Sequence, residues 1–199
     1  MPKITGEGTS EKYLHVLRGI KEPILLPFLR LFTALGIRAD HITWLGYLLA
    51  VAAVPLRDVG WLLVLAVADL AVDLLDGSLA RFQRTNDAAG TIFDAAHDAL
   101  FVMASTYALT AMGIVSFEAA YLYGTAYGLM AVLVLVRESL GNQARIMVRP
   151  RLYVFAALAL LLFTRIDIVS PVMLTGGILL AIHDAFSLRA ILRSLRKKA

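Results

Sequence analysis

Apolar residues follow one another along this chain in long runs that are separated by short polar stretches. Runs of this kind predict membrane-crossing helices, because about 20 apolar residues span the hydrocarbon core of a bilayer. The predicted spans cover residues 41–57, 60–82, 89–113, 116–138, 150–164 and 168–188. The expected fold is therefore an all-α integral-membrane protein, a bundle of six transmembrane helices occupying 41–188.

The segment before the first span has a different pattern. Residues 11–36 mix basic and apolar side chains at helical spacing and are interrupted by prolines. This pattern predicts an N-terminal interfacial amphipathic helix, with side chains such as Phe28 and Leu29 entering the lipid. A seventh, imperfect span over 22–36 is the alternative. We interpret the whole chain, 1–199, as a single membrane domain.

Composition supports a membrane protein. Of the 199 residues, 59% are hydrophobic and only 17% are charged, and the mean hydropathy is +0.75. A soluble domain carries charge on about a quarter of its residues. The absence of cysteine excludes disulfides, thiolate metal ligands and cysteine nucleophiles.

The positive charges lie almost entirely on one side of the predicted spans. All but two of the 19 lysines and arginines fall there, and only Arg57 and Arg165 lie on the other side. Cytoplasmic loops carry such an excess, so both termini of this multi-pass cell-membrane protein are expected in the cytoplasm. These basic residues fit anionic headgroups and phosphate-bearing substrates better than nucleic acid, which we do not expect as a partner.

Five aspartates fall inside the second and third predicted spans: Asp69, Asp73, Asp76, Asp94 and Asp98. An ionised carboxylate at the centre of a membrane helix costs ~2.5–3.5 kcal/mol, so a group of them needs a compensating charge. Clustered carboxylate oxygens are typical ligands of a hard divalent cation, which leaves Mg²⁺, Mn²⁺ or Ca²⁺ open.

The spacing of four aspartates places them on facing helices. Asp73 and Asp76 are three residues apart, and Asp94 and Asp98 are four apart, so each pair shares one helical face. A short polar turn makes the two spans antiparallel, and the pairs meet near the cytoplasmic boundary. Four carboxylates so arranged can hold two metal ions for in-line displacement at phosphorus. We expect the active site formed by these aspartates to face the cytoplasm.

Residues beside the aspartates refine this hypothesis. Gly77 costs about 1 kcal/mol inside a helix, which is reasonable where a ligand approaches the backbone. Arg81 lies on the same stripe, and its guanidinium can bind phosphate oxygens bidentately. Asp69, one turn deeper, is expected to hydrogen-bond to a neighbouring helix, and His97 to pack between helices or support the site indirectly.

Residues 73–98 follow the pattern D-x2-D-G-x2-A-R-x8-G-x3-D-x3-D. This motif resembles that of the CDP-alcohol phosphatidyltransferases. The resemblance implies transfer of a phosphatidyl-type group from CDP-diacylglycerol or an ether analogue to an acceptor hydroxyl, with release of CMP, by a homodimer. It implies two Mg²⁺ (or Mn²⁺) ions held by Asp73, Asp76, Asp94 and Asp98, with Asp98 also the general base. The implied CDP-binding residues are Asp73, Asp76, Gly77, Ala80, Arg81 and Gly90.

The acceptor is suggested by a narrower resemblance. Residues 27–46 are similar in layout to the phosphatidylinositol-phosphate synthase branch, which implies inositol phosphate as acceptor. The residues implied to hold its phosphate are Arg137, Arg149 and Arg151. Glycerol 3-phosphate, the acceptor of phosphatidylglycerophosphate synthases, is the alternative. Two other classes use comparable residues, a membrane prenyltransferase and a divalent-cation carrier.

Overall fold

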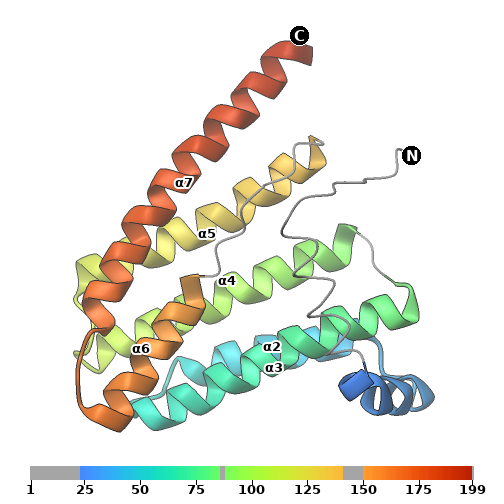
Figure 1. Cartoon of the computed structure of the whole chain (residues 1–199), viewed down its shortest axis with the longest axis horizontal. Coiled ribbons are helices and arrows are strands. Elements are labelled where there is room, and N and C mark those ends of the chain that lie inside the picture. Colours follow the sequence, from blue (N-terminus) through green and yellow to red (C-terminus); the bar gives the residue numbers. More distant parts are fainter. Residues whose placement is uncertain (1–22, 86–87, 141–149, 199) are drawn as a thin grey trace.

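A computed structural model describes residues 23–85, 88–140 and 150–198 of the chain. Within these ranges the chain forms helices and no strand, so the predicted all-α class is confirmed (Figure 1). The helices are Pro23–Ala34, α2 (Ala39–Ala53), α3 (Val59–Gln83), α4 (Ala88–Ala111), α5 (Phe117–Ser139), α6 (Pro150–Thr164) and α7 (Val169–Lys198). A helix occupies each of the six predicted spans.

Two of the described helices are long and apolar enough to cross a membrane, over Phe117–Arg137 and Val169–Arg196. The other helices are too short or are interrupted by acidic residues. α2 and α6 have 15 residues each, and α3 and α4 carry the aspartates within their apolar sequence. The count of six transmembrane spans therefore stays a prediction.

The surface of the molecule carries many large apolar side chains. Trp61 is 64% exposed, Phe163 is 78% exposed and Phe186 is 64% exposed, on α3, α6 and α7 respectively. Soluble monomers rarely expose apolar area that extends over several helices. Lipid is the surrounding that such a surface fits.

Local signals fix the ends of the helices. The Asp58 side chain accepts a hydrogen bond from the Trp61 backbone N–H (2.9 Å) and so caps α3. Arg84 ends the same helix in the left-handed conformation, with φ 57°. Pro150 begins α6, where its missing N–H costs nothing. Because α3 ends shortly before α4 begins, the aspartates at these two ends come near each other.

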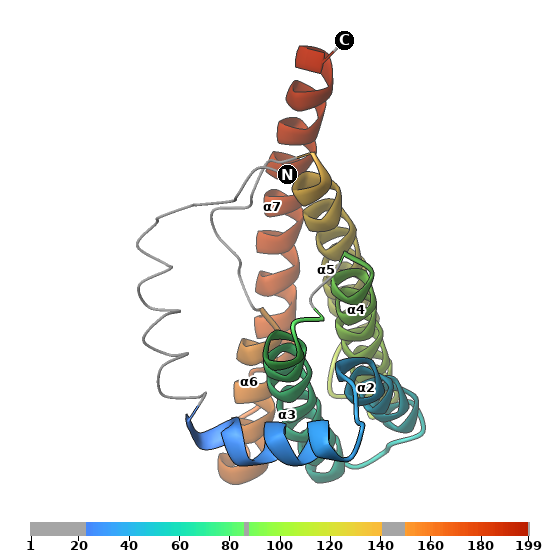
Figure 2. The same ribbon diagram turned by 90° about the vertical axis from the view of Figure 1, so that its right-hand side faces the viewer.

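The helices form one continuous bundle, in which α4 packs against α5 (Figures 1 and 2). α2 packs against both α3 and α4, and α5 packs along α7, while α6 contacts α3 and α7. α3 and α4 contact each other much less than each contacts α2. The space between the two aspartate-bearing helices is therefore bounded by α2 on one side and by α6 on another.

Aromatic and small residues fill the interior. Phe101 of α4 meets Phe155 of α6 edge-on, with ring centroids 6.2 Å apart. Tyr123 of α5 is 2% exposed and packs against α7 at Gly177. A Cβ added to Gly177 would lie 3.0 Å from the Tyr123 backbone nitrogen, so glycine permits this close approach of the two helices.

The helix Pro23–Ala34 lies across the end of the bundle (Figure 2). Phe28 is 53% exposed, as predicted, but Leu29 is 3% exposed and packs against Leu79 of α3. The expectation that Leu29 enters lipid is wrong, because this face of the helix covers α3. The described helix is shorter than a membrane span requires, whereas residues 11–22 of the predicted interfacial segment lie outside the described residues.

Candidate metal and nucleotide site

Three of the predicted metal ligands converge between α3 and α4. Asp73, Asp76 and Asp94 each offer a carboxylate oxygen, and these oxygens lie within 4.8 Å of one another. Helical spacing alone placed the pairs on facing stripes, and the fold brings the stripes together. The group has the oxygen-only chemistry that suits a hard divalent cation.

Asp76 is held by its surroundings. It is 4% exposed, and its Oδ2 accepts a hydrogen bond from the Thr43 hydroxyl of α2 (2.9 Å). Its Oδ1 accepts a bond from the Gly77 backbone N–H (2.5 Å). The sequence analysis did not identify Thr43. The available signal was weak: Thr43 is a polar residue three positions before Gly46, so the two share one face of α2.

The surroundings of Asp94 test whether a metal ion fits between these carboxylates. Its Oδ1 is buried and has no hydrogen-bond partner among the described residues. A buried carboxylate oxygen without a partner is costly, and carboxylates in such positions coordinate metals or are paired. With Asp73 and Asp76 close by, a divalent cation would satisfy this oxygen. The residues therefore fit the predicted metal, whose identity and number stay predictions.

Arg151 of α6 lies among the carboxylates. It is 3% exposed and forms an ion pair with Asp98. Its Nη2 is 2.7 Å from Asp73 Oδ2, and its Nη1 is 3.6 Å from Asp69 Oδ2. One guanidinium faces three carboxylates, so the cluster keeps an excess of negative charge that additional cations would offset. Arg151 was predicted as a phosphate ligand, and its contacts with the aspartates were not foreseen.

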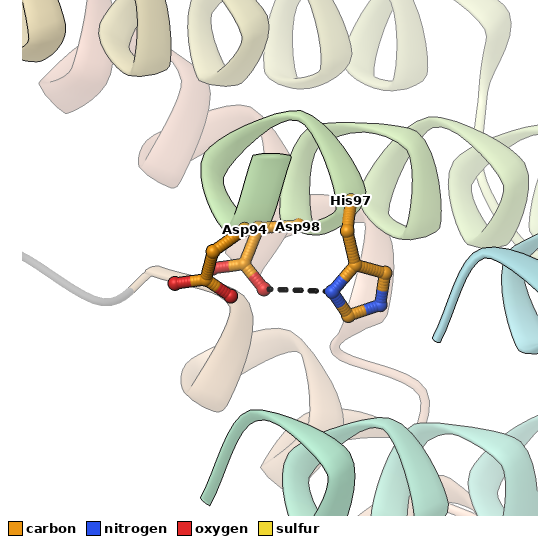
Figure 3. Close-up of side chains that lie close together, drawn as sticks. All are labelled: Asp94, His97 and Asp98. Carbon is orange, nitrogen blue, oxygen red and sulfur yellow. Dashed lines mark ion pairs between the residues drawn. The ribbon is translucent and has the colours of Figure 1, made fainter. Parts of the chain in front are cut away.

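His97 and Asp69 lie behind Asp98. Both are completely buried, and His97 Nε2 is 2.8 Å from Asp69 Oδ1. This contact confirms the prediction that Asp69 hydrogen-bonds to a neighbouring helix. His97 Nδ1 faces Asp98 Oδ1 at 4.0 Å (Figure 3), and Asp94, His97 and Asp98 each offer a ligand atom within 4.8 Å of the others. The sequence analysis did not predict this contact, although His97 is three residues from Asp94 and so lies on the same side of α4.

A cavity of about 140 Å³ adjoins the carboxylates. Its wall includes Asp76 and Asp94 together with Gly77, Ala80 and Gly90. These five residues belong to the predicted metal and CDP-binding set, and the fold assembles them around one space. Small side chains on one wall and carboxylates on another suit a ligand with a flat group and a metal-bound phosphate.

Gly77 is not explained by contacts with the residues that the structure describes. Among them, a Cβ added there would meet only Arg81 Nη1, at 3.5 Å, which is an ordinary van der Waals distance. The guanidinium of Arg81 thus lies beside Gly77, and it donates to the Ser78 hydroxyl at 3.1 Å. Because packing does not require glycine at this point, the open space in front of Gly77 suits a ligand.

The other two arginines predicted to bind the acceptor phosphate are Arg137 and Arg149. Arg137 Nη1 donates to the Ser187 hydroxyl at 3.2 Å, which links α5 with α7. Arg149 lies outside the described residues. The contacts of Arg151, by comparison, include the aspartates.

Comparison with known proteins identifies the protein family. Residues 25–189 match the CDP-alcohol phosphatidyltransferase family, and the chain belongs to this family of phosphotransferases. It is also 35% identical over 97 residues to the inner membrane protein YnjF of Escherichia coli (strain K12), over 47% of this chain and 44% of that protein. The chain thus aligns with less than half of this relative. The family match speaks against the prenyltransferase and the cation carrier.

Proposed function

We propose that this protein transfers a phosphatidyl-type group from a CDP-lipid, CDP-diacylglycerol or its ether analogue, to a hydroxyl of a polar acceptor and releases CMP. The observation that carries the proposal is the convergence of Asp73, Asp76 and Asp94 beside a cavity lined by Gly77, in a chain of this family. The unpartnered oxygen of Asp94 supports a metal at this point.

Each motif residue has a proposed role. The metal ligands are Asp73, Asp76, Asp94 and Asp98, and the CDP-binding residues are Asp73, Asp76, Gly77, Ala80, Arg81 and Gly90. Two bound Mg²⁺ ions, or Mn²⁺, would supply charge that neutralises the diphosphate and stabilises departing CMP. Gly77 and Ala80 leave space for the nucleotide, and the Arg81 fork binds phosphate oxygens beside it.

Asp98 is proposed as the general base. Its carboxylate accepts the proton of the acceptor hydroxyl while that oxygen bonds to the lipid-bearing phosphorus. The bond from this phosphorus to the CMP oxygen breaks, and CMP leaves with the electron pair. The ion pair between Asp98 and Arg151 supports the role, because a fixed partner holds the carboxylate in one orientation.

Inositol phosphate is the proposed acceptor, with Arg137, Arg149 and Arg151 as ligands of its phosphate. The burial of Arg151 beside Asp98 supports a phosphorylated acceptor. A phosphate bound to this guanidinium would bring a hydroxyl of the same small molecule close to the base. Glycerol 3-phosphate has the same chemistry and is the second candidate.

The proposed setting is the cell membrane. We infer a multi-pass homodimer with both termini and the active site in the cytoplasm. The exposed apolar surface and the two long apolar helices support the membrane, as does the relative that is an inner membrane protein. The one-sided placement of the basic residues supports the orientation.

The test is CMP release by the purified full-length protein in lipid vesicles that contain CDP-diacylglycerol or its ether analogue. Inositol phosphate, glycerol 3-phosphate, serine and inositol are supplied separately. We expect Mg²⁺-dependent release with a phosphorylated acceptor, abolished by EDTA and restored by Mg²⁺ or Mn²⁺. Full activity in EDTA, or no release with any acceptor, would contradict the proposal. Release with serine or inositol alone would contradict the proposed class of acceptor.

A further inference from the structure

We propose that Asp69 and His97 form a buried clamp that holds α3 and α4 at the separation required by the metal-binding carboxylates. Neither residue is a defining position of the aspartate motif. The inference rests on the metal-dependent transfer proposed above, and it assigns positioning roles to two residues outside the proposed set of metal ligands.

The contact itself is well placed for this role. Asp69 belongs to α3 and His97 to α4, both side chains are completely buried, and His97 Nε2 is 2.8 Å from Asp69 Oδ1. A hydrogen bond to a carboxylate is stronger than one between neutral groups, and burial away from water strengthens it further. The ring therefore fixes the position of one helix against the other.

The two helices need such a link. α3 and α4 contact each other much less than each contacts α2, so the side-chain bond between them adds a direct connection to the indirect one through α2. Asp69 is one turn before Asp73, and His97 immediately precedes Asp98. A change in the clamp is therefore transmitted to carboxylates on both helices, and metal ligands tolerate displacements of only a few tenths of an ångström.

α2 holds the ring from the other side. A Cβ added to Gly46 would overlap His97, lying 2.5 Å from its Cε1 and 2.7 Å from its Cδ2. Contacts this short do not occur, so the ring could not remain in place beside a larger residue. The Tyr47 ring, with its centroid 5.7 Å from that of His97, adds a further contact. Three helices thus meet at the imidazole.

α6 joins the clamp through Arg151. Its Nη1 lies 3.6 Å from Asp69 Oδ2, and the same guanidinium pairs with Asp98. Asp69 therefore has one oxygen directed to His97 and the other to Arg151. Both of these residues face Asp98, so one buried carboxylate supports the proposed base through two neighbours.

The experiment compares His97→Gln with His97→Leu in the full-length, detergent-solubilised protein. Glutamine can place its amide nitrogen near the position of Nε2 and donate to Asp69, whereas leucine has similar size and no donor. Mn²⁺ affinity is measured by electron paramagnetic resonance without nucleotide. We expect His97→Leu to weaken Mn²⁺ binding about 10–100-fold, as losses of such supporting hydrogen bonds do, and His97→Gln to stay within about 3-fold of the wild type.

Gly46→Ala provides an independent test, because it displaces the ring without changing any polar group. It should reproduce the weaker Mn²⁺ binding of His97→Leu, and circular dichroism should show that each variant keeps its helices. Gly128→Ala, where a Cβ meets nothing within 4 Å, is the matched control and should bind Mn²⁺ like the wild type. If His97→Leu does not fold, the comparison of Gly46→Ala with Gly128→Ala decides the question.

Two results obtained with the variants would overturn the clamp. One is a folded Gly46→Ala or His97→Leu protein that binds Mn²⁺ as tightly as the wild type. The other is a folded His97→Gln protein that binds Mn²⁺ as weakly as His97→Leu, since the hydrogen bond to Asp69 would then not matter. Wild-type protein that binds Mn²⁺ but releases no CMP would contradict the proposed function and leave the clamp supported by the variants. Wild-type protein without Mn²⁺ affinity would overturn both.

Discussion

At the scale of single residues, the site is a set of carboxylates whose surroundings differ. Asp76 accepts two hydrogen bonds, Asp98 pairs with Arg151, and Asp94 keeps a buried oxygen without a partner among the described residues. A metal ion would therefore add most at Asp94. Asp98, proposed both as a metal ligand and as the base, is also paired with Arg151, and this difference leads to the first prediction.

Replacing Asp98 by asparagine should separate the chemistry from metal binding. Asp98→Asn preserves size but removes the proposed base, so CMP release should fall about 100–10,000-fold. Asp73, Asp76 and Asp94 remain, so we expect Mn²⁺ binding to persist within about 10-fold. The two readouts are the rate of CMP release and Mn²⁺ titration of the same preparation. A variant with wild-type activity would show that another group takes the proton.

Replacing Gly77 by alanine should affect the ligand rather than the fold. Among the residues described in the structure, the new methyl group meets only the Arg81 side chain, at 3.5 Å, but it projects into the proposed nucleotide space. We expect CMP affinity, measured by calorimetry, to fall about 10-fold or more, since contact with the backbone is lost. The thermal midpoint should stay equal or rise slightly, because alanine favours a helix. Gly128→Ala is the control, and unchanged CMP affinity in Gly77→Ala would contradict the proposed role of Gly77 in binding the nucleotide.

At the scale of elements, one set of helices surrounds the carboxylates and another pair packs closely together. α3 and α4 present the carboxylates, and α2 and α6 lie beside them with Thr43, Gly46 and Arg151. α5 and α7 instead pack closely with each other, where Gly177 allows their backbones to approach. Stability and chemistry therefore depend on different helix pairs, which can be tested separately.

Gly177→Ala should loosen α5 from α7. The added Cβ would lie 2.9 Å from Leu122 Cγ and 3.0 Å from the Tyr123 backbone nitrogen, so the helices must move apart. Overpacking of this kind costs about 1–3 kcal/mol, which should lower the midpoint of thermal unfolding in detergent. Gly128→Ala on α5 should not lower it. A midpoint that is unchanged in Gly177→Ala would show that the two helices can separate at no cost.

At the scale of the whole molecule, the surface and the charges point to one orientation. Large apolar side chains cover the outer faces of several helices, and the basic residues gather on one predicted side. Positively charged loops remain in the cytoplasm, so the aspartate site near these loops should open there. This orientation agrees with a water-soluble acceptor and product.

Single cysteines can measure the orientation, because the chain contains none. Ile166→Cys lies between α6 and α7, and Arg196→Cys lies near the end of α7; both positions are exposed. In intact cells a membrane-impermeant maleimide should label Ile166→Cys, and it should label Arg196→Cys only after lysis. Labelling of both from the same side would contradict the predicted topology.

The sequence predicted the helices and their faces because both depend on neighbours along the chain. Runs of apolar residues and end signals such as Pro150 act over a few residues, and three- and four-residue spacing fixes which aspartates share a face. The contacts of Leu29, Thr43 and Arg151 could not be predicted in this way. Each involves a helix that is distant in the chain, and no local pattern gives the rotation of one helix against another.

The sequence by itself determined the family motif, the all-α class and the set of carboxylates, since each is written in residue types at fixed spacing. Only the tertiary structure decided that α3 and α4 are joined by Asp69 and His97 rather than by close packing along their length. It also decided that Arg151 of α6 reaches the same carboxylates. The physical reason is that buried charges must find partners in space, and those partners lie on whichever helices the fold brings together.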